Sequence, residues 1–194
     1  MSHTIYNTEA FVVSSRNSGE ADRTFRLFTK DFGVISAKAT GIRKVSSRLR
    51  FFVQDFKYID ASIVKGKNYW RLVSARPIHE LNSRKSLTTS SRIRSLQLVG
   101  KLAPEGESLT ELFDELVSAY TFTSTNHPKK EDLESIEALI ALKILHSLGY
   151  WGDKQSENDL VKSPFNENVV AQVKLSKKTI IKELNNSLRA TQLL

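Results

Sequence analysis

The chain has 194 residues, 40% hydrophobic and 26% charged, with a formal net charge of +8, which suits a soluble globular protein of one large or two small domains. It contains no cysteine, which excludes disulfides, a thiol nucleophile and cysteine-based metal sites, and its four histidines show no metal-ligand spacing. No apolar run approaches the roughly 18 residues that span a bilayer, and residues 1–4 lack a signal-peptide pattern, so we expect a cytoplasmic protein without a membrane partner.

Short strands separated by turns are predicted throughout the first 80 residues. Residues 24–29 alternate between two faces with the period of two that is typical of a strand, and a turn over 30–33 joins them to 34–39 as a hairpin. The other expected strands are 10–13, 53–64 and 69–75, with turns over 14–22 and 65–68, and Pro77 is expected to end the last strand. Five short strands without a long helix favour a small sandwich or barrel.

A basic segment, residues 39–52, interrupts these strands. It carries Arg43, Lys44, Arg48 and Arg50, and no acidic residue occurs anywhere from 32 to 54. Most of the excess charge lies in this half of the chain, because residues 1–80 hold 14 Lys/Arg against 7 Asp/Glu, whereas 81–194 hold 15 against 14. Guanidinium groups beside small hydroxyls suit a phosphate, and a localised positive field attracts polyanions, so nucleic acid is the first candidate ligand and an anionic membrane the second. A solvated basic loop without a ligand is the alternative.

The aromatic side chains of the first half have two possible roles. We expect six of them in the barrel core: Phe11, Phe25, Phe28, Phe52, Phe56 and Tyr58. Tyr69 and Trp70 are adjacent in a predicted strand, so one ring should point inward and the other outward. The outward ring either stacks on a base or covers apolar surface.

From residue 81 the apolar spacing becomes helical. A first helix is expected to 102 with Ser83 as its cap, and a second after Ser108, where Glu111 completes a capping box. Residues 131–148 are apolar nearly all round and predict a buried central helix that ends before Gly149, with His146 as a structural histidine. Residues 150–168 read as irregular, and Ser176 as the cap of a last helix over 177–191. The second half is therefore expected to be a helical unit beside the barrel.

Taken in order, these landmarks resemble the RecO family of bacterial recombination mediators over roughly the first 150 residues. The matching segments are Ser18-Gly19-Glu20-Ala21-Asp22-Arg23, Leu27-Phe28-Thr29-Lys30-Asp31-Phe32-Gly33, Gly41-Ile42-Arg43, Ser47-Arg48-Leu49-Arg50, Gln54-Asp55-Phe56, Gly66-Lys67, Leu102-Ala103-Pro104-Glu105-Gly106-Glu107, Leu112-Phe113 and Leu148-Gly149-Tyr150. No single motif is decisive, but the ordered series is fairly specific.

The resemblance implies an α+β protein with an N-terminal five-stranded OB-fold barrel over 1–80 and an all-α helical domain over 81–194. It implies a non-enzymatic DNA repair and recombination mediator that binds single- and double-stranded DNA, promotes strand annealing and assists RecA loading. RecR and single-strand-binding protein would be partners, and no cofactor or metal is implied. Arg43 and the segment 47–50 match the positions of DNA-backbone contacts.

The chain departs from the family pattern at three places. Thr40 stands where the family usually has a lysine before Gly-x-Arg, although Lys38 is near. Many members carry a four-cysteine zinc module after Leu-Gly-Tyr, and this chain has no cysteine there. Residues 138–141 read Ala-Leu-Ile-Ala, where the family often has an Arg and a Phe near the pocket for the tail of single-strand-binding protein.

The leading hypothesis is charge neutralisation, in which basic side chains hold the phosphates of two strands and reduce their repulsion. The candidate DNA-binding residues are Arg23, Arg26, Lys38, Arg43, Lys44, Arg48 and Arg50. An RNA- or ribosome-associated barrel is the alternative, since charge does not distinguish DNA from RNA. A nuclease or ligase is disfavoured, because the pairs Asp22/Asp31 and Asp55/Asp60 are isolated and no nucleotide-binding lysine motif is present.

Overall fold

The computed structural model describes residues 4–78, 86–151 and 155–190, and it divides the chain into two compact units. The first unit comprises Met1–Ser83 and Ala103–Thr110, and the second comprises Arg84–Leu102 and Glu111–Leu194. The boundary predicted at 80/81 and the cap predicted at Ser83 lie outside the described residues.

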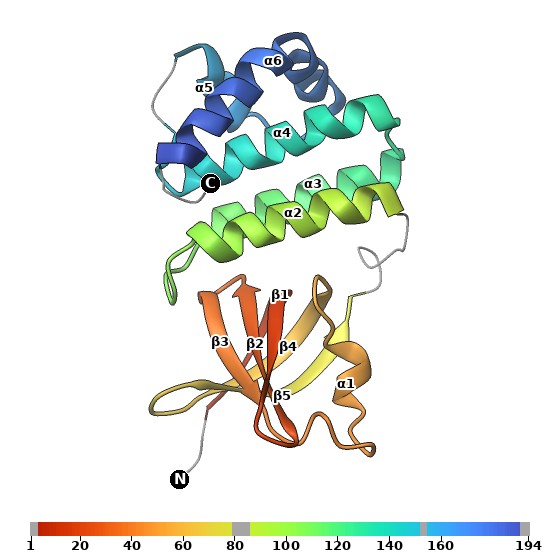
Figure 1. Cartoon of the computed structure of the whole chain (residues 1–194), viewed down its shortest axis with the longest axis vertical. Coiled ribbons are helices and arrows are strands. Elements are labelled where there is room, and N and C mark those ends of the chain that lie inside the picture. The colour runs from red at the N-terminus through yellow and green to blue at the C-terminus, as the bar shows by residue number, and fades with distance from the viewer. Residues whose placement is uncertain (1–3, 79–85, 152–154, 191–194) are drawn as a thin grey trace. The chain divides into compact units, whose positions relative to one another are not determined.

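Five strands of the first unit form a closed barrel (Figure 1). The strands are β1 (Ile5–Ser18), β2 (Asp22–Thr29), β3 (Gly33–Ala39), β4 (Tyr58–Lys65) and β5 (Trp70–Pro77), and the short helix α1 (Leu49–Phe52) lies between β3 and β4. Their order around the barrel is β1-β2-β3-β5-β4, in which β3 and β5 run parallel and all other neighbours run antiparallel. This is the predicted OB-fold barrel, and with the helical second unit it confirms the predicted α+β class.

The barrel closes around the apolar face that the alternation predicted. Phe25 and Leu27 of β2 are fully buried, as are Ile59 and Ile63 of β4. At the edge of this core, Trp70 packs against Tyr6 and Phe32, with ring centroids 5.8 and 4.9 Å apart respectively. Since burying one large apolar side chain contributes about 1.5–3 kcal/mol, this closed core is the main stabilising feature of the unit.

Three strand boundaries differ from prediction, and the first is the start of β1, which lies at Ile5 rather than at residue 10. The turn predicted over 14–22 is mostly strand, because 14–18 pair with β2 after a register shift between Val12 and Ser14, and only 19–21 form the turn. Residues 14–18 are all polar and lie on a hairpin exposed to solvent. The apolar alternation that identifies a strand is therefore absent from this part of the sequence. The strand predicted from 53 begins at Tyr58, because the chain leaves α1 through irregular structure.

The segment 103–110 is distant in sequence from the barrel but packs on it within the first unit. The backbone N–H of Gly106 donates to the carbonyl of Val34 at 2.8 Å, and the Thr110 hydroxyl donates to the carbonyl of Lys30 at 3.1 Å. A Cβ at Gly33, which has a φ of 61°, would lie 1.7 Å from the Glu107 carbonyl oxygen. Glycine at position 33 therefore permits this close approach of two backbone segments.

The second unit consists of α2 (Ser86–Leu102), α3 (Thr110–Asn126), α4 (Lys130–Ser147), α5 (Gln155–Lys162) and α6 (Glu167–Ala190). Helix α4 contacts α2, α5 and α6 and is the buried central helix that the sequence predicted. It ends before Gly149, which has a φ of 75°, as expected.

His146, near the end of α4, is only partly buried. None of the helices in the described part of the chain combines the length and apolar character needed to cross a membrane.

Three helix boundaries also differ from prediction. Residues 155–162 form α5 within the segment expected to be irregular, and α6 begins at Glu167 rather than after Ser176. The side chain of Asn166 accepts a hydrogen bond from the Val169 backbone N–H at 3.0 Å and is therefore the N-cap of α6. Ser176 lies inside the helix and donates to the Gln172 carbonyl at 3.2 Å. Helix α3 begins at Thr110, two residues beyond the predicted cap at Ser108.

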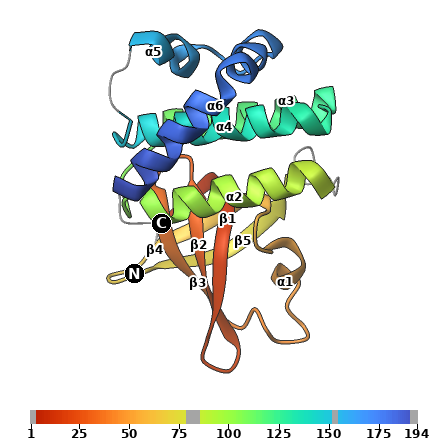
Figure 2. The same cartoon turned by 45° about the horizontal axis from the view of Figure 1, so that its top comes forward.

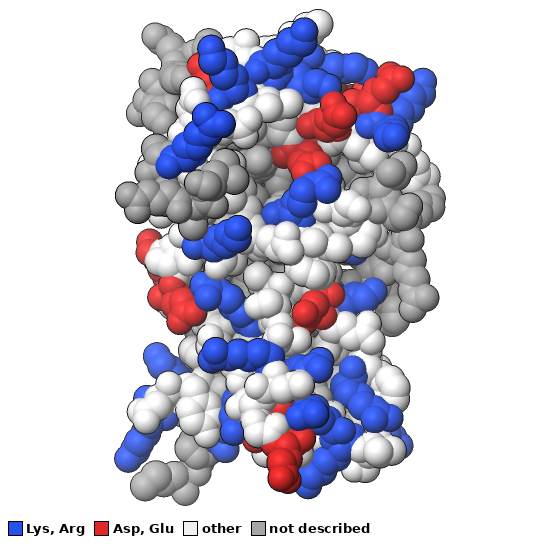
Figure 3. Space-filling model, in the orientation of Figure 1, with Lys and Arg blue, Asp and Glu red and all other residues white. Residues whose placement is uncertain are grey.

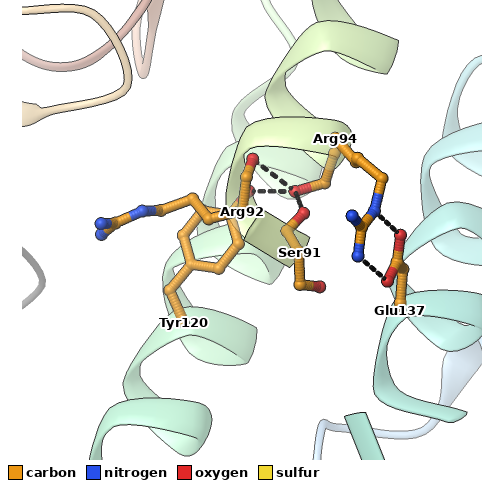
Figure 4. A network of polar contacts seen from close by, with 6 residues as sticks. Ser91, Arg92, Arg94, Tyr120 and Glu137 are labelled. Carbon is orange, nitrogen blue, oxygen red and sulfur yellow. Dashed lines mark hydrogen bonds and ion pairs between the residues drawn. The ribbon is translucent and has the colours of Figure 1, made fainter. Parts of the chain in front are cut away.

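Polar side chains join the helices of this unit (Figure 4). The Ser95 hydroxyl of α2 lies 2.6 Å from the Tyr120 hydroxyl of α3, and burial raises the pKa of Tyr120. Arg94 of α2 forms a two-pronged ion pair with Glu137 of α4, which raises the pKa of Arg94. Such paired hydrogen bonds fix the register of one helix against another.

The buried ammonium of Lys143 is a feature that the apolar pattern of α4 concealed. Its side chain is 4% exposed, and its Nζ lies 2.7 Å from a Glu115 carboxylate oxygen. It also donates to the carbonyls of Val161 and Ser163, at 2.6 and 2.9 Å. These carbonyls lie at the C-terminal end of α5, so the cation joins three helices and satisfies groups that would otherwise lack donors.

Candidate nucleic-acid interface

The basic segment is fastened to one end of the barrel, beside the β1–β2 turn (Figure 2). The backbone N–H of Arg43 donates to the Ala21 carbonyl at 2.9 Å, and its guanidinium donates to the Gly19 carbonyl at 3.1 Å. The backbone N–H of Gly41 donates to the Asp22 carboxylate at 2.8 Å. The start of the segment is therefore held by specific bonds to the turn and to the start of β2.

Asp22 also pairs with one of the candidate cations. Lys38 Nζ lies 2.9 Å from Asp22 Oδ2. The hydrogen bond from Gly41, and then the one from Lys38, lower the pKa of Asp22, and the same contact raises the pKa of Lys38. Lys38 is thus charged but already paired, so a phosphate must compete with Asp22 for it.

Lys44, Arg48 and Arg50 differ in this respect. Among the described residues, none of these three side chains, nor that of Arg43, has a carboxylate within ion-pair distance. The Arg50 guanidinium lies 4.6 Å from the centre of the Phe51 ring. Its Nε is buried and has no hydrogen-bond partner in the described part of the chain. The buried Nε cannot reach an external anion, but without a carboxylate partner the ammonium of Lys44 and the terminal guanidinium nitrogens of Arg48 and Arg50 remain available to one.

A second group of cations lies on the outer face of the strands. Cross-strand pairing aligns Arg16 with Thr24, Thr24 with Lys38, and Lys38 with Arg71, which makes one row over β1, β2, β3 and β5. The neighbouring row aligns Ser14, Arg26 and Ser36. A groove of about 240 Å³ lies over the first three strands and is lined by Ser14, Ser15, Arg16, Thr24, Arg26, Ser36 and Glu105. Hydroxyls and guanidinium groups in one groove are suitable donors for a phosphate.

One carboxylate already occupies part of this groove. Arg26 lies 3.4 Å from a Glu105 oxygen, and Glu105 comes from the segment 103–110 that packs on β3. The Nε of Arg26 is buried without a hydrogen-bond partner among the described residues. A phosphate that binds here must displace Glu105 or share Arg26 with it.

The predicted site residues therefore fall into three places. Arg43, Lys44, Arg48 and Arg50 belong to the basic segment, whereas Arg26 and Lys38 lie on the outer face of the strands. Arg23 lies on the opposite face of β2 from Arg26, and its Nε donates to the Asn17 side chain at 3.2 Å. Figure 3 shows Lys and Arg side chains gathered on the visible face of the barrel, with few Asp or Glu among them.

Sequence reasoning missed Arg16 and Arg71. Arg16 was assigned to a turn, and Arg71 lies in a predicted strand whose neighbours were unknown. Only the register of β1 against β2 and of β3 against β5 aligns them with Lys38. Residues 14–18 are all polar, so no local pattern identified them as a strand or could have placed Arg16 on its outer face.

The aromatic predictions have mixed outcomes. Phe11, Phe25, Phe28 and Tyr58 are fully or nearly fully buried, but only Phe25 belongs to the barrel core. Phe11, Phe28 and Tyr58 each follow or precede a residue that faces this core, so they lie on the outer face of the strands, where the Phe11 and Tyr58 rings stack 4.7 Å apart. Phe56 is only partly buried, with a φ of 65°. The prediction for Phe52 is wrong, because α1 directs Leu49 and Val53 to the core and leaves Phe52 39% exposed. Trp70 points inward and Tyr69 is 53% exposed, which confirms that the two rings point apart.

No cluster of three or more His, Cys, Asp or Glu side chains that could hold a metal occurs among the described residues. The fold and the distribution of cations define an OB-fold barrel with a basic surface.

Comparison with known proteins identifies which OB-fold family this is. The family model described as "Recombination protein O N terminal" matches residues 1–81. A DNA repair protein RecO from Heliobacterium modesticaldum is 32% identical over 148 residues, which cover 75% of this chain and 52% of the relative. The corresponding protein of Desulfitobacterium hafniense is 29% identical over 154 residues, which cover 75% and 52%. The chain belongs to the RecO family, and it spans about half the length of these curated relatives.

Proposed function

We propose that this protein acts in DNA repair and recombination by binding single- and double-stranded DNA through its barrel. Its similarity to proteins named DNA repair protein RecO supports the repair role. The observation that carries the binding proposal is the basic segment, in which Lys44, Arg48 and Arg50 have no carboxylate partner among the described residues. The segment is already held against the β1–β2 turn, so it loses less conformational entropy when DNA binds, and this favours affinity.

The mechanism we propose is neutralisation of phosphate charge on two strands. The basic segment holds one backbone, and the cations on the outer face of the strands hold another. Reducing the repulsion between complementary strands promotes their annealing. In the cytoplasm, the same binding would assist RecA loading onto strands coated with single-strand-binding protein, with RecR as a partner.

We propose that no bond chemistry accompanies this binding. A metal nuclease needs clustered carboxylates, and the two acids that flank β2 have other partners. Asp22 accepts from Gly41 and Lys38, and Asp31 accepts the Thr8 hydroxyl at 2.6 Å. A magnesium-dependent cleavage assay should show no product from either single- or double-stranded DNA.

The contact with single-strand-binding protein requires a separate test in this chain. Ala138, Leu139 and Ile140 are buried in α4 and supply core surface rather than an exposed pocket. Annealing should therefore be measured on bare strands and on strands coated with single-strand-binding protein. Annealing of bare strands alone would support the DNA-binding role and argue against that partner.

The binding site is tested by charge reversal. The triple variant Arg43→Glu/Arg48→Glu/Arg50→Glu should lose DNA binding while retaining its circular dichroism spectrum. The matched control is Lys178→Glu/Lys182→Glu/Arg189→Glu, which makes the same change in net charge on exposed positions of α6 and should bind almost normally. Normal binding by a folded triple variant would refute the site.

Two further measurements define the ligand. Affinity should fall steeply with salt, because each phosphate contact releases counterion, and a flat response would contradict the mechanism. Competition between matched DNA and RNA strands distinguishes the proposed function from an RNA-associated barrel, since preferential displacement by RNA would favour the latter.

A further inference from the structure

We propose that Phe51 is a stacking platform for a nucleobase, so that the basic segment binds unpaired bases as well as phosphates. This inference rests on the proposed DNA binding and extends it, because stacking distinguishes single strands from duplex. A base in a duplex is already stacked on its neighbours, whereas an unpaired base has an exposed face.

The short helix α1 displays the Phe51 ring outward. Leu49 packs against the barrel core and Val53 is 1% exposed, so both ends of α1 are anchored. The backbone N–H of Val53 donates to the Leu49 carbonyl at 3.1 Å, which closes the turn. Phe51 lies between these anchors and is 62% exposed, and Phe52 beside it is 39% exposed. Exposing two adjacent phenylalanines on an anchored turn contributes nothing to the core and requires a different explanation.

Arg50 supports one side of the Phe51 ring. Its guanidinium carbon lies 4.6 Å from the ring centre, the geometry of a cation–π contact. This contact orients the ring and places a cation beside it. A base on the accessible part of the ring would bring its own phosphate toward Arg48 and Arg50, neither of which has a carboxylate partner among the described residues.

The charge around the ring identifies the occupant. No acidic residue occurs from 32 to 54, so the ring belongs to a segment with only positive charges. An apolar ring beside a cation, in a segment without acids, fits a ligand that combines planar apolar surfaces with negative charge, and a single strand of nucleic acid has both. A neutral apolar protein surface would bring these cations together without neutralising them.

The test compares probes with and without bases, using the full chain. Phe51→Ala should weaken binding to an oligothymidylate by about tenfold, which is within the range for the loss of one stacked base. It should leave binding to an abasic oligonucleotide of the same length, and to duplex DNA, nearly unchanged. Ile5→Ala is the matched control, because Ile5 is 60% exposed on the barrel but has no aromatic ring, and it should alter neither affinity.

Two variants separate stacking from a general apolar contact. Phe51→Leu should behave like Phe51→Ala, whereas Phe51→Trp should keep affinity and its added fluorescence should be quenched by the oligothymidylate but not by the abasic probe. Equal loss on both probes, rescue by leucine, or no loss at all would overturn the stacking role, and leucine rescue would indicate an apolar protein partner. Absence of DNA binding by the unmodified chain would refute the proposed function itself.

Discussion

Removing the carboxylate of Glu105 should strengthen DNA binding, although the residue lies outside the predicted site. Glu105 pairs with Arg26 at 3.4 Å, at the edge of the groove over β1, β2 and β3. In Glu105→Gln the groove loses its internal anion and Arg26 becomes available to a phosphate. The substitution is nearly isosteric, and the side chain is 57% exposed, so the barrel should remain folded.

The size of the effect follows from the exposure of the pair. The side chains of Arg26 and Glu105 are 34% and 57% exposed, and exposed ion pairs contribute about 0.2–1 kcal/mol. A phosphate no longer has to break this pair, so affinity should rise between about 1.4-fold and 5-fold. One added phosphate contact should also steepen the dependence of log affinity on log salt by about 0.7 for a single strand. Fluorescence anisotropy at several salt concentrations measures both quantities.

Two controls decide whether the local pair is responsible. Glu107→Gln removes the same charge from the same segment, but Glu107 has no ion pair among the described residues, so its effect should be smaller. In an Arg26→Ala background, Glu105→Gln should have almost no effect. An unchanged affinity in Glu105→Gln, or an equal rise in Glu107→Gln, would refute the proposed competition at Arg26.

Three further predictions concern stability. Lys143→Met should lower the free energy of unfolding of the helical unit by about 3–5 kcal/mol in urea denaturation, because it leaves Glu115 and buried carbonyls without their donor. Gly33→Ala should destabilise the barrel by more than about 1–2 kcal/mol, since it adds a clash with Glu107 to the strain of positive φ. Asp22 has a lowered pKa in the folded protein, so its contribution to stability is full above its ordinary pKa of 3.8 and disappears as pH falls through the lower folded-state value. Asp22→Asn should remove this acid-dependent part of the denaturation profile.

Matched variants accompany the first two of these predictions. Lys174→Met breaks an exposed ion pair with Asp132 and should cost far less than Lys143→Met. Gly19 also has a positive φ, but the space around an added methyl group is open. Gly19→Ala should therefore lower the free energy of unfolding by the backbone strain alone. Equal effects within any pair would contradict the corresponding explanation.

Local patterns correctly predicted the strands and helices that bury apolar side chains in a hydrophobic core. The alternation of Phe25 and Leu27 and the all-round apolar surface of α4 are signals of this kind, and both elements were found where expected. The prediction failed in the second half of β1 and in α5, because these segments are mostly polar and give no apolar periodicity to read. At the start of α6, the sequence contains two suitable caps, Asn166 and Ser176, and only packing determines which one begins the helix.

The sequence by itself determined that the positive charge lies in the β-rich half and that no acid occurs within the basic segment, because both are properties of local composition. Only the tertiary structure decided which cations are available to a ligand. Asp22 lies 16 residues before Lys38 and Glu105 lies far beyond Arg26 in the chain, yet folding makes each the partner of that cation. The same is true of Phe51, whose exposure depends on how Leu49 and Val53 anchor α1 to the barrel. Ion pairing and burial depend on distances between segments that are remote in sequence, and no local pattern records those distances.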